Sequence, residues 1–122
     1  MPSPIEDGGE ILVAVADSSP LFRIGLVAVL ESEPGFAVAA EASDAAGAIA
    51  AIEDGPDVAV VDVDLPEPGG LGVLEAAQHR GSPTGILLLA SGEGSAPLYR
   101  ALSLGVGGYL AKRSEADRVC AA

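Results

Sequence analysis

Cysteine, aromatic and basic residues are all scarce in this chain of 122 residues. The one cysteine, Cys120, excludes a disulfide framework and a cysteine-based zinc site. Two phenylalanines, two tyrosines and no tryptophan mean that the core must be aliphatic, in a chain that is 49% hydrophobic. This cysteine usage is typical of a reducing cytoplasm, which is the setting we expect.

Acidic side chains outnumber basic ones by 18 to six, for a net charge of −12. A domain of this charge repels phosphate backbones, so we expect no direct nucleic acid binding by the domain itself. No apolar run approaches the roughly 18 residues that a membrane helix needs, so no membrane span is expected. The first ten residues are acidic and have no apolar stretch, so we expect no secretory signal there.

Five short apolar runs predict strands. They are Ile11–Ala16, Phe36–Ala40, Asp57–Val61, Gly85–Leu89 and Gly107–Leu110. Several are continuously apolar, as expected for parallel strands that are covered on both faces. Residues 1–10 carry proline, glycine and acid without periodicity, so we expect a flexible N-terminal segment followed by one domain over residues 11–122.

Helix-like segments lie between these runs. The expected helices are Pro20–Ser32 after Ser18 and Ser19, Ser43–Glu53 with Ser43 as its N-cap, Gly70–Arg80, and Ala96–Leu104 with a stop at Gly105. A further helix begins at Ser114–Asp117 and is expected to be truncated at the end of the chain. The five β-α repeats predict an α/β fold, a doubly wound five-stranded parallel sheet in the order 2-1-3-4-5.

Charged residues follow three of the predicted strands, at the edge where such sheets bind ligands. Asp17 follows the first strand, Asp62 the third, and Lys112, the one lysine, the fifth. Two carboxylates suit Mg²⁺, and a lysine suits a phosphoryl group, so a small site for a cation and an oxyanion is predicted. The alternative is that Asp17 caps a helix and Asp62 is a turn residue; the coincidence with the lysine favours a functional site.

Three segments resemble the receiver domains of bacterial response regulators, in the correct order. They are Ala16-Asp-Ser-Ser-Pro-Leu-Phe-Arg-Ile-Gly-Leu26, Asp57-Val-Ala-Val-Val-Asp-Val-Asp-Leu-Pro66 with Gly69-Gly-Leu71, and Leu104-Gly-Val-Gly-Gly-Tyr-Leu-Ala-Lys112. The resemblance runs from about Ile11 to Asp117 and is strongest to the NarL/FixJ group, whose effectors are LuxR-type helix-turn-helix domains. It implies a flavodoxin-like, CheY-like fold and control of transcription through an output domain that this chain lacks.

The resemblance also implies a role for each residue that matches the family pattern. Asp62 matches the aspartate that accepts a phosphoryl group from a sensor histidine kinase. Asp17 and Asp62, with the backbone carbonyl of Asp64, match the Mg²⁺ ligands. Lys112 matches the lysine that pairs with the acceptor and phosphoryl oxygens, and Tyr109 matches the ring that turns inward on activation.

Two positions depart from the family pattern. Ser18 replaces a second acidic residue, and an uncharged hydroxyl is a poor Mg²⁺ ligand. Ala90 stands where the family has a hydroxyl residue at the end of the fourth strand, and the neighbouring Ser91 would point to the other face. Asp64 could restore part of the missing charge. We therefore expect an atypical receiver, with Mg²⁺ binding and phosphorylation of Asp62 weak or absent.

Other functions remain open at this point. One is a working receiver that tolerates both substitutions. Another is a pseudo-receiver that senses a ligand, or acts as a dimerisation module, without phosphorylation. A small flavodoxin-like enzyme is disfavoured, because the sequence has no nucleotide-binding glycine motif and no paired nucleophile and base.

The first predicted helix carries an unusual number of apolar residues. Over Leu21–Leu30 its one charged residue is Arg23. If Arg23 and Glu31 face outward, Ile24 and Val27 lie on or beside the exposed face, which suggests a contact surface. We expect a homodimer or a docked effector domain to use the first and last helices; the alternative is an apolar surface without a partner.

Overall fold

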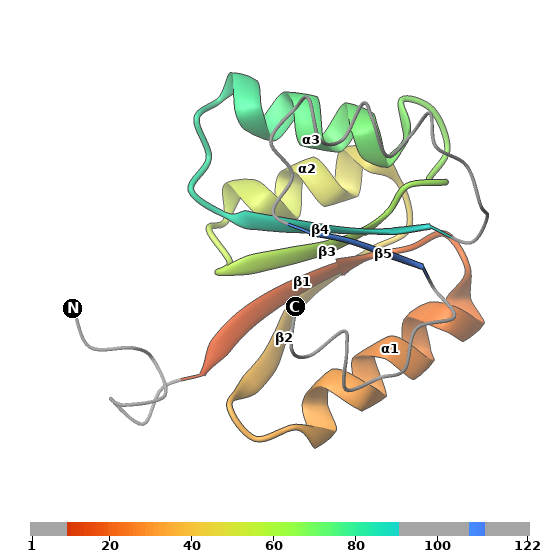
Figure 1. Ribbon diagram of the computed structural model, residues 1–122, viewed down its shortest axis with the longest axis vertical. Coiled ribbons are helices and arrows are strands. Elements are labelled where there is room, and N and C mark those ends of the chain that lie inside the picture. Colours follow the sequence, from red (N-terminus) through yellow and green to blue (C-terminus); the bar gives the residue numbers. More distant parts are fainter. Residues whose placement is uncertain (1–9, 91–107, 112–122) are drawn as a thin grey trace.

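The computed structural model describes residues 10–90 and the backbone of 108–111. Strands and helices alternate along these residues (Figure 1): β1 Ile11–Ala16, α1 Pro20–Ser32, β2 Phe36–Ala42, α2 Ala45–Glu53, β3 Val58–Asp62, α3 Gly69–His79, β4 Gly85–Ala90 and β5 Gly108–Ala111. All neighbouring strands are parallel, in the order β2-β1-β3-β4-β5. The predicted fold class and strand order are confirmed.

Helices cover both faces of the sheet, with α1 on one face and α2 and α3 on the other (Figure 1). Successive residues of the central strands alternate between the two cores. Val13, Val15 and Val60 pack with Leu26 and Leu30 of α1. The intervening residues of the same strands pack towards α2 and α3. Each central strand therefore needs apolar residues at consecutive positions, which is why these strands are continuous apolar runs.

The first helix begins and ends where the sequence predicts. The side chain of Ser19 accepts a hydrogen bond from the Phe22 N–H, and Pro20 occupies the first turn, where its missing N–H costs nothing. The predicted N-cap of the next helix is wrong by one residue. Asp44, not Ser43, caps α2, because its Oδ1 accepts a charge-assisted bond of 2.7 Å from the Gly47 N–H.

The bounds of β1 are as predicted, and the other differences amount to one or two residues. Strand β2 continues to Ala42, past the charged Glu41, because β2 is an edge strand on which a carboxylate can face solvent. The structure moves the bounds of β3, β5 and α3 by one residue at each end and extends β4 by one residue, to Ala90. The helices expected over 96–104 and from Ser114 lie outside the described residues. No helix among the described residues is long and apolar enough to cross a bilayer.

Candidate functional site

Asp17 and Asp62 lie at the same edge of the sheet, at the carboxyl ends of two neighbouring strands. Ala16 pairs with Val61, so the residue after β1 stands beside the last residue of β3. Both side chains are almost fully buried, with 1% and 3% of their surface exposed. Buried carboxylates are uncommon unless bonds or a cation hold them. The structure therefore brings together the two acidic residues that the sequence predicts.

Backbone N–H groups fix one oxygen of each carboxylate. The Ser19 N–H donates to Oδ1 of Asp17 over 2.8 Å, and the Asp64 N–H donates to Oδ1 of Asp62 over 3.0 Å. The bond to Asp62 is the local turn contact that the structural alternative predicted for this residue. That alternative is wrong for Asp17, because Ser19 and not Asp17 is the N-cap of α1. Both bonds are local contacts that span two residues. They also orient the two carboxylates at the edge of the sheet, so the structural and functional roles are compatible.

The residues around this pair offer few side chains that could bind a metal ion. Asp64 and Ser18 are exposed, and among the described residues no three acidic, histidine or cysteine side chains are grouped closely enough to hold a metal ion. Two carboxylates and a backbone carbonyl remain as donors, a set that Mg²⁺ accepts when water completes its coordination. The donor set fits Mg²⁺ but lacks the charge of a third carboxylate.

The predicted switch residues lie beside this edge. Ala90 is the last residue of β4 and is 5% exposed, and it pairs with Ala111 of β5. It follows Leu89, the register partner of Asp62. A methyl group cannot donate a hydrogen bond at this position. Tyr109 pairs with Leu88 through the backbone, whereas the Tyr109 side chain and Lys112 lie outside what the structure describes.

Two residues near the site were not predicted to belong to it. Gly70, at the beginning of α3, packs so closely on β3 that a Cβ atom there would lie 2.5 Å from the Asp62 carbonyl oxygen. The adjacent glycines in the sequence are a signal for such an approach. Arg23 was used only to mark the outward face of α1. In the structure its side chain turns towards the β1-α1 loop and is 20% exposed.

This direction of Arg23 changes the expected contact surface. Leu21 and Ile24 are 84% and 63% exposed, so apolar exposure on α1 is confirmed for Ile24. It is wrong for Val27, which is partly buried against the core beneath α1. The exposed apolar face therefore lies nearer the beginning of the helix than Arg23 and Glu31 indicated.

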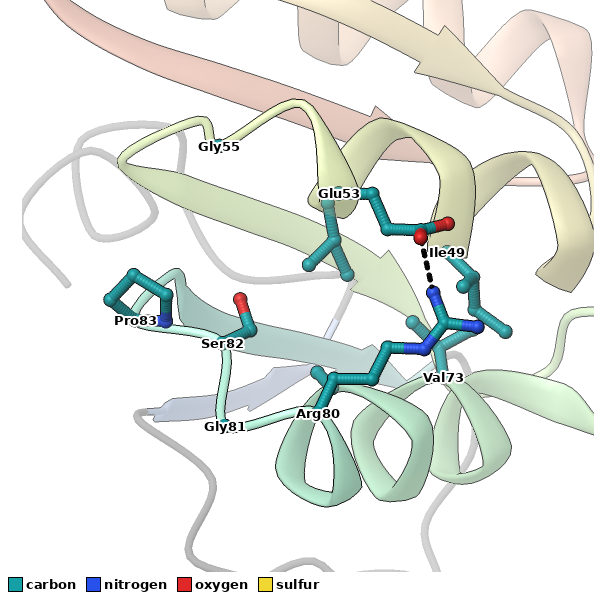
Figure 2. Close-up of a pocket in the computed structure, with 10 residues that line it drawn as sticks. Ile49, Glu53, Gly55, Val73, Arg80, Gly81, Ser82 and Pro83 are labelled. Carbon is teal, nitrogen blue, oxygen red and sulfur yellow. Dashed lines mark ion pairs between the residues drawn. The ribbon is translucent and has the colours of Figure 1, made fainter.

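A hollow of about 310 Å³ lies at the other edge of the sheet, between the ends of α2 and α3 (Figure 2). Its floor includes Ile52 and Val73, and an ion pair of 2.7 Å joins Arg80 to Glu53 beside it. Both charged side chains are about half exposed, so the pair contributes little to stability. None of the predicted site residues lines this hollow, and we assign it no role in the acidic site.

The family of response regulator receiver domains matches residues 13–122. The chain is 37% identical over 106 residues to the transcriptional regulatory protein NarL of Mycobacterium tuberculosis, which covers 86% of this chain and 49% of that protein. It is 34% identical over 106 residues to the nitrate/nitrite response regulator protein NarP of Escherichia coli, with the same coverage. The chain thus spans about half the length of these relatives.

A solved structure agrees with these matches. The signal receiver domain of the response regulator NarL from Mycobacterium tuberculosis superposes with a TM-score of 0.86 at 35% identity, covering 90% of each chain. A protein-glutamate methylesterase/protein-glutamine glutaminase of Anaeromyxobacter dehalogenans is 42% identical over 110 residues, but the match spans only 32% of it. The relatives of this domain thus include proteins with different names and lengths, and each of these matches spans only part of the relative. This chain belongs to the family of response regulator receiver domains, and its relatives include the NarL-type transcription regulators.

Proposed function

We propose that this domain is the receiver of an atypical response regulator that controls a DNA-binding domain, and that Asp62 accepts a phosphoryl group only weakly. The observation that carries the proposal is the buried pair of Asp17 and Asp62 at the ends of adjacent strands. Transfer would break the bond between phosphorus and the donor's leaving group and form an acyl phosphate at Asp62. A sensor histidine kinase is the donor we propose, in the cytoplasm.

The chain's own residues divide this work between them. Asp17, Asp62 and the Asp64 carbonyl would hold Mg²⁺, which neutralises charge on the transferring group. Lys112 would pair with the phosphoryl oxygens. Ala90 supplies no hydroxyl to them, and Ser18 supplies no charge to the metal, which is why we expect the yield of phosphorylated Asp62 to be low.

Intact mass spectrometry tests this proposal. The protein is incubated with Mg²⁺ and acetyl phosphate, beside Asp62→Ala as the control. We expect a minor species heavier by one phosphoryl group, which Asp62→Ala lacks. Nearly complete conversion would contradict weak phosphorylation and identify a fully working receiver. A species that persists in Asp62→Ala would contradict Asp62 as the acceptor, and no heavier species at all would favour a pseudo-receiver that works without phosphorylation.

The exposed apolar face of α1 is defined by Leu21 and Ile24. It supports a second copy of this chain as the partner that covers this surface in a homodimer. We expect Leu21→Ser/Ile24→Ser to weaken self-association at least about tenfold, because two exposed aliphatic side chains lose their apolar contact. Sedimentation over a concentration series measures this. Leu12→Ser, which removes an exposed leucine from β1, is the matched control and is expected to change nothing. A monomer at high micromolar concentration would contradict the homodimer.

A further inference from the structure

Arg23 is the described basic side chain that contacts the loop carrying Asp17. Residues 10–90 contain only two basic side chains of the lysine or arginine type, Arg23 and Arg80. Arg80 lies in the ion pair beside the hollow at the other edge (Figure 2). Nη1 of Arg23 donates to the Asp17 carbonyl oxygen over 2.7 Å, and Nε donates to Oε1 of Glu41 over 3.3 Å.

These contacts are among several bonds that hold Asp17. The Asp17 N–H donates to the Ala42 carbonyl at the end of β2 over 3.0 Å. Its carbonyl accepts from Arg23, and its carboxylate accepts from the Ser19 N–H. A guanidinium is a rigid fork that can bond two acceptors in fixed directions, which a lysine cannot reproduce. Arg23 therefore joins α1, the β1-α1 loop and the end of β2 at one residue of the acidic site.

We propose that Arg23 is a positioning residue for Asp17, with Glu41 as its outer anchor. Arg23 and Glu41 together keep the β1-α1 loop in the conformation that places the Asp17 carboxylate beside Asp62. They thereby set the affinity of the site for Mg²⁺. This inference rests on the proposed function of Asp17 and Asp62 as metal-binding residues. The bond to the Asp17 carbonyl is short and partly buried, so it dominates, whereas Glu41 is half exposed and its longer bond mainly orients the fork.

The test compares Arg23→Met with Arg80→Met, which removes the same side chain and the same charge at the other edge of the sheet. Hydrogen exchange of the Ser19 amide, followed by NMR, reports on the loop without any ligand. Titration with Mg²⁺ alone reports on the site. We expect Arg23→Met to speed Ser19 exchange and to raise the half-saturating Mg²⁺ concentration, each by about tenfold, because a charge-assisted bond is lost. Arg80→Met is expected to leave both unchanged.

Two further variants separate positioning from stability. Arg23→Lys keeps the positive charge but loses the planar guanidinium. Its Ser19 exchange rate and its half-saturating Mg²⁺ concentration are expected to fall between those of wild type and Arg23→Met. Glu41→Gln is expected to have a smaller effect. A purely structural role would lower the midpoint of urea unfolding while leaving Mg²⁺ affinity unchanged in the folded protein. If Arg23→Met does not fold, Arg23→Lys and Glu41→Gln are compared with Arg80→Met in the same two measurements.

Equal exchange and equal Mg²⁺ affinity in the Arg23 and Arg80 variants would overturn the inference. Failure of the proposed function gives a different result. In that case the wild-type protein binds no Mg²⁺, and Ser19 exchange alone decides whether Arg23 holds the loop. If Ser19 exchange becomes faster only in the Arg23 and Glu41 variants, the positioning of the loop by Arg23 is supported although no Mg²⁺ binds.

Discussion

Replacing Gly70 with alanine is expected to lower the free energy of unfolding by about 2 kcal/mol. The new Cβ would lie 2.5 Å from the Asp62 carbonyl oxygen and 2.7 Å from Cα of Val63, distances that real side chains do not adopt. These neighbours are backbone atoms, which cannot rotate away. Crowding of this kind costs about 1–3 kcal/mol and sometimes more, while the better helix propensity of alanine offsets only about 1 kcal/mol.

Urea unfolding measures the effect, and Gly25→Ala is the matched control. Gly25 lies in the middle of α1, and nothing is within 4 Å of the position of its added Cβ. The same substitution there is expected to stabilise the protein by about 0.5–1 kcal/mol, because alanine loses less conformational entropy on folding. The two variants thus have opposite expected signs. A Gly70→Ala protein as stable as wild type would mean that α3 does not press on β3.

Gly70→Ala is also expected to disturb the acidic site, since relief of the clash must move β3 or the beginning of α3. The Asp62 carbonyl accepts a hydrogen bond from the Leu65 N–H, and the Val63 carbonyl accepts one from the Gly70 N–H. Movement of either group shifts the loop whose Asp64 N–H holds the Asp62 carboxylate. The NMR shift of the Asp64 amide should therefore change in Gly70→Ala and not in Gly25→Ala.

The strands of this fold can be predicted from sequence because the central sheet is buried on both faces. Each core cluster takes alternate residues of β1, β3 and β4, and the two clusters together take consecutive residues. The apolar runs therefore coincide with these strands to within a residue. The edge strand β2 is harder. Its last three residues pair with β1 after a shift of register between Val13 and Ala14, which no apolar pattern indicates.

The acidic pair could be predicted because each residue directly follows or ends an apolar run, and parallel strands share one carboxyl edge. The role of Arg23 could not. An arginine between apolar neighbours indicates an outward face by periodicity, but this one bonds a backbone carbonyl six residues earlier and a carboxylate of β2. Such a contact depends on how α1 packs beside β2, which is a tertiary property.

Restoring both family positions is expected to raise the phosphorylated fraction of the protein at least about tenfold. The variant is Ser18→Asp/Ala90→Ser, treated with Mg²⁺ and acetyl phosphate and measured by intact mass. Ser18 is exposed, so an aspartate there is tolerated and adds a charged ligand next to Asp17. Ala90 ends β4 one residue beyond the partner of Asp62, and a serine hydroxyl there can donate to a phosphoryl oxygen.

The two single variants separate the effect of the missing charge at residue 18 from the effect of the missing hydroxyl at residue 90. Ser18→Asp is expected to lower the half-saturating Mg²⁺ concentration, because ligand charge sets affinity for hard cations. Ala90→Ser is expected to tighten binding of beryllofluoride, a phosphoryl mimic, by about tenfold at fixed Mg²⁺, since it adds a charge-assisted hydrogen bond. Ser32→Asp adds the same charge at the far end of α1, and Ala77→Ser adds a buried hydroxyl in α3. Neither control is expected to change either affinity.

The combined variant also tests why phosphorylation of the natural sequence is expected to be weak. The Asp17 and Asp62 carboxylates are already buried and oriented by backbone N–H groups. The acceptor carboxylate of Asp62 is therefore already in place in the natural sequence. If charge at residue 18 and a hydroxyl at residue 90 are the missing parts, supplying both must help more than supplying either. A double variant no more phosphorylated than wild type would show that neither residue limits the reaction, and would contradict the two substitutions as the cause of weak phosphorylation.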